Sequence, residues 1–377
     1  MAQIRQQIQP LIASRNIKVI KRNITQQLHR EFSSFNYYSN ARNVQYSKLT
    51  DISVTNIRLK SDASAKIPKD ILLYSNKNGV TTLTMNQPKK LNGWTGPMML
   101  ALKDAFTRAA SDDNTKVAVL TGADPYYCAG VNLSDTIKPM HPATLHKMIY
   151  ESNAAIFNVF IDFQKPLIIA ANGPAIGACF TSATLCDCII ASEKATFSTP
   201  FARLGVPPEG CSSVHFERIM GKKNADRMLG SEGWIPTASE AKEAGFVKEV
   251  VAHDKLLARA QEIGEQVIEC FFGAITPLIL KSEFISFCKS KNTLISFIFQ
   301  IISSGTGKVF AQGHGTPSEY KQVNDEESRQ LADAFLAYKF LDAQYNFLKS
   351  KGKGQLANVF WILKTFRPLW SWMLPKK

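Results

Sequence analysis

The sequence has no hydrophobic run long enough to cross a membrane. Among its 377 residues, no stretch reaches the ~18 consecutive apolar residues that a spanning helix requires. Residues 166–186 carry no charge, but Asn172, Gly173 and Pro174 interrupt them. Residues 292–307 are also uncharged, but their apolar part is too short. We therefore do not expect a membrane-spanning protein.

The sequence also lacks CxxC pairs and the histidine spacings typical of metal sites. The chain has seven cysteines, an odd number, with no CxxC pair, and no secretory signal is visible. Its six histidines show no HExxH or other metal-ligand spacing. This pattern predicts free thiols in a reducing compartment and no metal site. His141 and His146 are interpreted as surface or pocket-lining residues.

Acidic residues are scarce at both ends of the chain. Residues 1–50 hold eight Lys or Arg and one acid, and residues 351–377 hold six and none, whereas the middle is nearly neutral. A nucleic-acid-binding protein concentrates its positive charge on a folded face, so we expect no nucleic-acid partner. Residues 1–70 are interpreted as a basic, transit-like segment followed by a polar linker. A disordered tail or a linker remains the alternative.

Ordered structure is expected from residue 71 onward. Two apolar runs joined by a turn that ends in Asn78-Gly79 predict a β-hairpin. Beyond it, short buried strands alternate with helical patterns, which favours an α/β fold with mainly parallel pairing. Strands are predicted at residues 71–74, 80–85, 116–121, 167–171, 187–191 and 195–198. Helices are predicted at 95–110, 142–163 and 177–185, over most of 212–267, and at 318–348.

Two segments depart from this pattern. Residues 282–316 are β-prone and then glycine-rich, and we interpret them as an unexplained insertion. Residues 351–377 contain three of the five tryptophans beside basic residues, and they predict an amphipathic helix broken near Pro368. We favour packing of this segment on the body or on a neighbouring subunit, while contact with a membrane surface remains the alternative.

Three turn-like segments carry the candidate chemistry, at residues 126–133, 172–179 and 199–211. In the first two, small residues allow backbone N–H groups to be exposed, and a turn that opens a helix attracts negative charge. Alternatively, the small residues only permit close packing. The third segment places Glu209 just before a predicted helix, where a solvated helix-end residue is the plain alternative.

The order and spacing of these segments, together with Asn86-Gln87-Pro88-Lys89-Lys90-Leu91-Asn92, resemble the crotonase (enoyl-CoA hydratase/isomerase) superfamily. The resemblance covers roughly residues 70–275 and resumes at 325–348. It is closest to the peroxisomal and mitochondrial Δ3,Δ2-enoyl-CoA isomerase type, because of residues 208–213 and 216–221. It implies a crotonase-like spiral of ββα repeats with C-terminal helices over residues 71–350, assembled as a homotrimer.

The resemblance also implies roles for individual residues. Glu209 would be the catalytic base, and the Ala129 and Ala178 N–H groups would form an oxyanion hole. CoA would belong to the substrate, and neither a metal nor a redox cofactor would be needed. Lys89 and Lys90 are also compatible with a solvated loop, and Cys128 and Cys179 with small core residues. The implied substrate-binding residues are Cys128, Ala129, Gly130, Val131, Asn132, Gly177, Lys89 and Lys90.

One departure from the family pattern distinguishes the isomerases from the hydratases. The hydratases use two carboxylates, and the matching positions here are Thr181 and Phe201. We therefore expect isomerisation of 3-enoyl-CoA to trans-2-enoyl-CoA in the breakdown of unsaturated fatty acids. The alternatives are an inactive acyl-CoA-binding module, a thioester hydrolase or a weak hydratase. The basic start and the absence of an SKL-type end favour the mitochondrial matrix, with the peroxisome as alternative.

Overall fold

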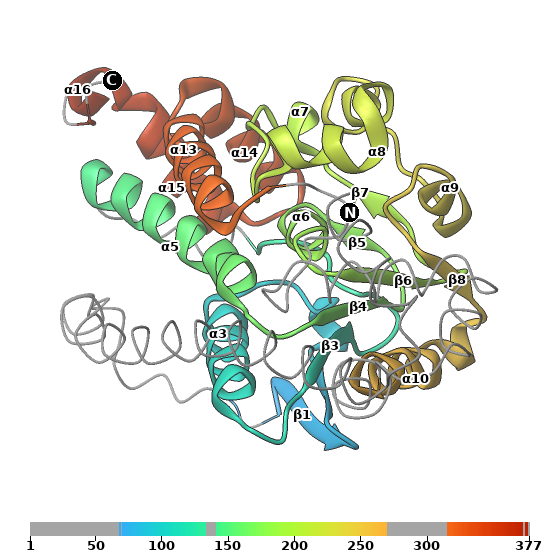
Figure 1. Ribbon diagram of the computed structural model, residues 1–377. Coiled ribbons are helices and arrows are strands. Elements are labelled where there is room, and N and C mark those ends of the chain that lie inside the picture. Colours follow the sequence, from blue (N-terminus) through green and yellow to red (C-terminus); the bar gives the residue numbers. More distant parts are fainter. Residues whose placement is uncertain (1–67, 69, 133–140, 270–314, 372–373, 376–377) are drawn as a thin grey trace, which may run out of the picture. The chain divides into compact units, whose positions relative to one another are not determined.

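The computed structural model describes residues 68, 70–132, 141–269, 315–371 and 374–375, and it shows an α/β fold (Figure 1). The transit-like segment and nearly all of the insertion predicted at 282–316 lie outside the described residues. Within the described residues, a central sheet is covered by helices on both faces.

The central sheet has six strands in the order β1-β2-β3-β4-β6-β8. Only the first pair is antiparallel, and all the others are parallel. This arrangement confirms the parallel α/β fold that was predicted. The strands are β1 (Leu72–Lys77), β2 (Val80–Met85), β3 (Val117–Gly122), β4 (Leu167–Ala171), β6 (Cys188–Ser192) and β8 (Glu249–Val251).

The predicted hairpin forms at the start of this sheet. Lys77 pairs with Val80, so Asn78 and Gly79 alone make the turn. Both have positive φ, at 52° and 83°. Asn and Gly adopt such angles more readily than other residues, and the right-handed twist of the strands requires them in a two-residue turn.

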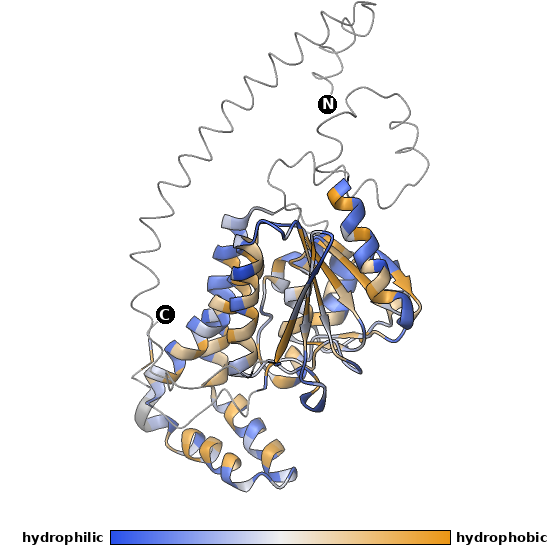
Figure 2. Cartoon of the chain, turned by 90° about the horizontal axis from the view of Figure 1, so that it is seen from below, coloured by the Kyte–Doolittle hydropathy of each residue, from blue (hydrophilic) through white to orange (hydrophobic). Residues whose placement is uncertain are grey.

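The alternating side chains of the strands build two separate cores. On one face, Val119, Ile168 and Ile190 pack against α10 (Leu256–Ile268). On the other face, Leu120 and Ile169 pack against helices that include α3 (Gly96–Ser111), α5 (Pro142–Asp162) and α6 (Ala178–Ala183). In Figure 2 the strands are mostly hydrophobic, whereas the flanking helices alternate between hydrophilic and hydrophobic residues. Burial on both faces explains the continuous apolar runs of the parallel strands.

A second, two-stranded sheet lies in the segments that follow the central strands. Its strands, β5 (Ala175–Ile176) and β7 (Phe197–Ser198), pair in parallel. The strand predicted at 195–198 is thus shorter than expected. Two short helices that the sequence did not predict, η1 (Pro88–Lys90) and α7 (Phe201–Leu204), accompany this region.

Two of the long helical predictions need correction. The region 212–267 holds α8 (Ser212–Leu229), α9 (Ala238–Glu243) and α10, but β8 and η2 (His253–Lys255) intervene. An edge strand of three residues is too short to show alternation. The helix predicted at 318–348 is divided into α13 (Pro317–Phe335) and α14 (Tyr338–Ser350), with the break at Leu336 and Ala337.

The basic C-terminal segment packs on the rest of the domain. It contains α15 (Gly354–Thr365) and α16 (Arg367–Trp370), so the helix breaks at Phe366, two residues before Pro368. Ala357, Phe360 and Leu363 are buried in one cluster with residues of α5, α13 and α14. This contact favours the packing alternative. None of the described helices combines the length and apolarity that a membrane span requires.

Candidate active site

Two turns after neighbouring strands lie side by side. The first follows β3 and the second follows β4. The Cys128 N–H donates to the Pro174 carbonyl at 3.2 Å, and the Ile176 N–H donates to the Cys128 carbonyl at 3.0 Å. Gly130 has a φ of 91°, and a Cβ there would lie 3.0 Å from the Ile176 carbonyl oxygen. Glycine therefore permits both the backbone conformation and the close approach of the two turns.

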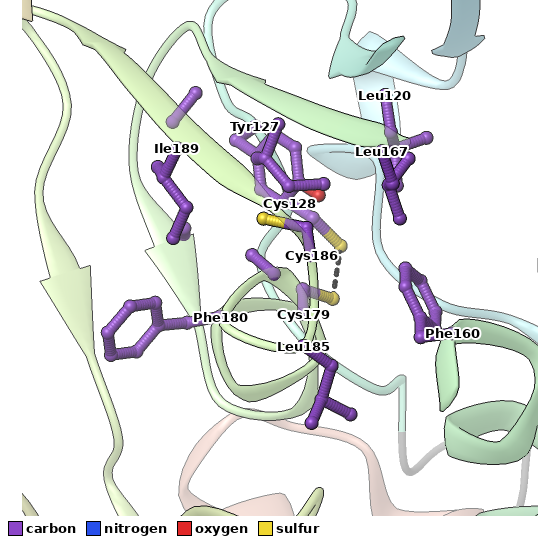
Figure 3. Close-up of a cluster of buried hydrophobic side chains, with 14 of the residues drawn as sticks. Leu120, Tyr127, Cys128, Phe160, Leu167, Cys179, Phe180, Leu185, Cys186 and Ile189 are labelled. Atoms are coloured by element: carbon purple, nitrogen blue, oxygen red, sulfur yellow. Dashed lines mark hydrogen bonds between the residues drawn. The ribbon is translucent and has the colours of Figure 1, made fainter. Parts of the chain in front are cut away.

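The two cysteines of these turns lie beneath them in the apolar core. Figure 3 shows the side chains of Cys128 and Cys179 directed toward each other among Tyr127 and Phe160, and their Sγ atoms are 2.6 Å apart. Both are fully buried. Burial raises the pKa of the Cys179 thiol well above its ordinary value, so this thiol stays protonated. This setting supports the small-core interpretation over a nucleophilic one.

A third turn carries Glu209 to the same place. Gly210 and Cys211 both have positive φ, at 68° and 65°. A Cβ on Gly210 would lie 2.3 Å from the Phe157 ring and 2.6 Å from the Thr181 hydroxyl. Only glycine leaves room for the turn to pack this closely against α5 and α6, so Gly210 fixes the position of its neighbour Glu209.

The carboxyl group of Glu209 is almost completely buried. Its residue is 7% exposed, and Oε2 accepts a 2.5 Å hydrogen bond from Nδ2 of Asn153 on α5. Burial raises the pKa of Glu209 from its ordinary 4.5 to about 7, and repulsion from Glu327 acts in the same direction, while the Asn153 hydrogen bond opposes both. A carboxyl with this pKa can both accept and return a proton near neutral pH.

Glu209 faces a cavity of about 150 Å³ that both turns line. Among the described residues, the polar ones in the lining are Ser152, Asn153 and Glu209, and Glu209 is the single acid. The rest of the lining is apolar or backbone. Its larger apolar side chains include Met99, Ile149, Ile156, Phe201, Phe335 and Phe340.

The hydrogen bonds of the first turn correct one prediction. The Ala129 N–H donates to the Leu91 carbonyl at 3.0 Å, so it is not available to a ligand oxygen. The two neighbours of Val131 both bond to Trp94. The Trp94 N–H donates to the Gly130 carbonyl, and the Asn132 N–H donates to the Trp94 carbonyl. Between them, the Val131 N–H has no hydrogen bond to any residue that the structure describes, and Val131 lines the cavity.

The second turn presents a similar donor. Ala178 is the first residue of α6, directly after Gly177, whose φ of 61° turns the chain into the helix. The first N–H groups of a helix have no partner within it. Within the described ranges the Ala178 N–H has no hydrogen-bond acceptor, and Ala178 lines the cavity. Val131 therefore replaces Ala129 as the counterpart of Ala178.

The structure brings most of the predicted site residues together. Ala129, Gly130, Val131, Gly177, Ala178 and Glu209 all line the cavity. Cys128 is buried, and neither Cys128 nor Asn132 belongs to the lining. Lys89 and Lys90 are exposed in η1, also outside the lining, although Leu91 next to them holds the Ala129 N–H. His146 pairs with Asp333 at 2.9 Å and is likewise outside.

Sequence reasoning missed Asn153, the direct partner of the buried acid. Asn153 and Ser152 lie on the face of α5 that also presents Ile149 and Ile156 to the cavity. A polar residue at an apolar position of a helix is the signal that points to such a role, because a buried amide needs a partner.

The positions that carry carboxylates in the hydratase pattern hold no acid at the cavity. Thr181 is fully buried and donates its hydroxyl to the Ala178 carbonyl at 3.1 Å. Phe201 places its apolar side chain in the cavity lining. Among the described residues, no group of three or more His, Cys, Asp or Glu is arranged to hold a metal ion.

The fold and the cavity define an α/β protein whose site combines one buried acid with exposed backbone donors. Residues 75–278 match the family model described as enoyl-CoA hydratase/isomerase. The chain belongs to the enoyl-CoA hydratase/isomerase family, and the crotonase-type fold implied by its motifs is confirmed. A crystal structure of an enoyl-CoA hydratase/isomerase from Pseudoalteromonas atlantica is similar, with a TM-score of 0.57 at 25% identity, covering 74% of this chain and 97% of that one.

Two relatives by sequence add to this result. The peroxisomal enoyl-CoA delta isomerase 3 of Mus musculus is 40% identical over 195 residues, which are 50% of this chain and 59% of the mouse protein. An uncharacterised protein of Caenorhabditis elegans is 37% identical over 213 residues, 56% of this chain and 79% of that protein. The chain thus spans about three fifths of the mouse isomerase.

Proposed function

We propose that this protein isomerises 3-enoyl-CoA thioesters to trans-2-enoyl-CoA thioesters, with Glu209 as the single catalytic base. The observation that carries the proposal is the cavity itself. Among the described residues, it is lined by one acid with a pKa of about 7, by two backbone N–H groups that bond to no other described residue, and otherwise by apolar or neutral side chains.

The proposed reaction moves one proton within the substrate. The Glu209 carboxylate removes a proton from C2, and the electron pair of that C–H bond delocalises onto the thioester oxygen, which gives a dienolate. The Val131 and Ala178 N–H groups stabilise the negative oxygen. Glu209 then returns the proton to C4, so that the double bond moves from C3–C4 to C2–C3. No atom or electron is gained or lost, and hence we propose that no cofactor takes part.

The described part of the cavity lining holds no second acid, which favours isomerisation over hydration. Addition of water across a double bond needs groups that orient the water and transfer its protons. Thr181 bonds to a backbone carbonyl, and Phe201 has no exchangeable proton. We therefore propose that hydration is weak or does not occur.

The remaining proposals follow the family resemblance. CoA enters as part of the acyl-CoA substrate, and Lys89 and Lys90 are candidates for contact with its phosphates because η1 adjoins the first turn. We propose a homotrimer with no nucleic-acid partner. We propose that the protein works in unsaturated fatty acid breakdown in the mitochondrial matrix, with the peroxisome, named for the mouse relative, as the alternative.

The test compares wild type with Glu209→Gln on 3-hexenoyl-CoA, and follows the formation of trans-2-hexenoyl-CoA. We expect wild-type turnover and a loss of at least about 10³-fold in the variant, since removal of an essential base abolishes both proton transfers. Glu217→Gln is the matched control, because Glu217 is exposed on α8.

Each outcome has a distinct meaning. Equal rates in wild type and Glu209→Gln remove Glu209 from the mechanism. Formation of 3-hydroxyhexanoyl-CoA or free CoA as the main product indicates a hydratase or a thioester hydrolase instead. A folded wild type that binds acyl-CoA without turnover indicates a binding module.

A further inference from the structure

A second buried carboxyl group lies behind the turn that carries the base. Glu327, on α13, is 4% exposed. Its Oε2 accepts a 2.6 Å hydrogen bond from the Cys211 N–H, and its Oε1 accepts a 2.9 Å bond from the Ser213 N–H. Glu327 is outside the cavity lining, so its carboxyl group is not placed to touch a substrate.

The turn needs this support because its backbone conformation is unusual. Gly210 and Cys211 both adopt left-handed angles, and Cys211 has a Cβ that disfavours them. Cys211 and Ser213 also lie at the start of α8, where N–H groups have no intrahelical partner. A carboxylate there bonds with the orphan donors and interacts favourably with the helix dipole.

We propose that Glu327 is a positioning residue, which fixes the Glu209 turn from behind and tunes the base through its negative charge. The same helix reaches the base by a second route. Ser328 donates its hydroxyl to Oδ1 of Asn153 at 2.8 Å, and Asn153 donates to Glu209. Adjacent residues of α13 thus hold both the turn and the hydrogen-bond partner of the base.

Few titratable groups among the described residues face the pair. Glu209 is faced by Glu327 from α13 and by the thiol of Cys179 from α6, and Glu327 is faced by the thiol of Cys211. Burial raises the pKa of Glu327, and the hydrogen bonds from Ser213 and from the Cys211 N–H oppose this rise. Two backbone N–H groups donate to the Glu327 carboxyl and favour its ionised form, and a negative charge there resists ionisation of Glu209.

This inference rests on the proposed isomerase, and Glu327→Gln tests it. The amide keeps the shape but removes the charge and one acceptor. We expect kcat on 3-hexenoyl-CoA to fall about 10- to 100-fold with a smaller change in KM, because the base is displaced. We also expect the acid limb of the kcat/KM profile to move toward lower pH by about half a unit or more.

Two further variants separate charge from geometry. Glu326→Gln is the matched control, since Glu326 is the exposed neighbour on the same helix, and we expect wild-type behaviour. Glu327→Asp keeps the charge, but the shorter side chain withdraws the carboxylate from the Glu209 turn by about one methylene. We expect it to lower kcat without moving the acid limb, and it remains decisive if Glu327→Gln does not fold.

The infrared band of the protonated Glu209 carboxyl gives a readout that needs no turnover. Its assignment comes from Glu209→Gln, in which the band is lost. We expect its titration midpoint to shift toward acid in Glu327→Gln alone. If the wild type turns over no 3-enoyl-CoA but the midpoint still shifts in Glu327→Gln, the proposed function fails and the tuning of Glu209 by Glu327 stands. An active Glu327→Gln with unchanged kcat and unchanged midpoint overturns the inference, as does a Glu327→Asp variant with unchanged kcat.

Discussion

The cavity lining consists of two groups of residues, which we call the reactive end and the apolar end according to their chemistry. At the reactive end, three turns present backbone N–H groups and one carboxyl, and glycines at 130 and 210 allow the turns to approach one another. At the apolar end, side chains of α5, α13 and α14 make the wall. There Phe335 and Phe340, on either side of the break between α13 and α14, stack with centroids 4.5 Å apart and an interplanar angle of 5°.

This difference predicts how each end responds to substitution. The reactive end depends on backbone N–H groups, on close approach at glycines and on one carboxyl group with its supports. Changes that remove an N–H, add a Cβ to a glycine or alter the carboxyl group or its supports should matter most there. The apolar end depends on volume, and its changes should alter which acyl chain fits. The first kind of change should cost orders of magnitude in rate, and the second should alter selectivity.

After loss of the base itself, the largest expected effect is that of Ala178→Pro. Proline is tolerated at the first position of a helix, which Ala178 occupies, but it removes the N–H that we assign to the oxyanion. We expect kcat to fall about 10²- to 10³-fold, the usual cost of losing one such donor, while the circular dichroism spectrum and Tm stay close to wild type.

The matched control is Ala238→Pro, which makes the same change at the first residue of α9, outside the cavity. We expect that variant to keep wild-type kcat. If Ala178→Pro keeps it as well, the Ala178 N–H does not stabilise the reacting oxygen, and the reactive end does not depend on backbone donors.

The next effect is the pH dependence of the reactive end. Glu209 must be ionised to accept a proton, so kcat/KM should fall about tenfold per unit below its pKa of about 7. Stability should change in the opposite sense. The folded-state pKa lies above the ordinary 4.5, so the stabilising contribution is fully present below pH 4.5 and is lost as pH rises through about 7.

This loss amounts to about 3 kcal/mol in the free energy of unfolding, at 1.36 kcal/mol per pKa unit. Denaturant titrations of wild type and Glu209→Gln between pH 4.5 and 8 measure it. We expect the variant to become the more stable of the two at the alkaline end. A constant difference across this range contradicts the raised pKa.

The sequence predicted the fold more fully than it predicted the site. Periodicity located β2, β3, β4, α3 and α5, because each is long enough to show its pattern. It missed β8 and η1, which have three residues each and no complete period. It also joined α13 to α14, since the break at Leu336 and Ala337 involves neither glycine nor proline.

Within the site, the motif predicted which segments meet, but not which atoms face the cavity. Ala129 and Val131 are two residues apart in one turn, and only the hydrogen bond from the Ala129 N–H to Leu91 tells them apart. Asn153 and Glu327 come from segments remote from Glu209 in sequence, and tertiary packing alone brings them to it. Such contacts are outside the reach of local patterns.

The smallest effect is expected at the apolar end, from Phe335→Ala. Phe335 lines the cavity, so the space that its ring fills should limit the length of the acyl chain that the site accepts. Removal of the Phe335 ring, which is only partly buried, should raise kcat/KM on 3-decenoyl-CoA relative to 3-hexenoyl-CoA by a few-fold to about tenfold.

The comparison uses the ratio of the two substrates, so a general loss of stability does not imitate the effect. Phe347→Ala is the control, because Phe347 on α14 is 55% exposed and outside the cavity lining. If Phe335→Ala instead lowers the rates on both substrates equally, the stacked rings support the position of the reactive end. Phe335 and Phe340 would then set rate rather than selectivity, and the contrast between the two ends would not hold for them.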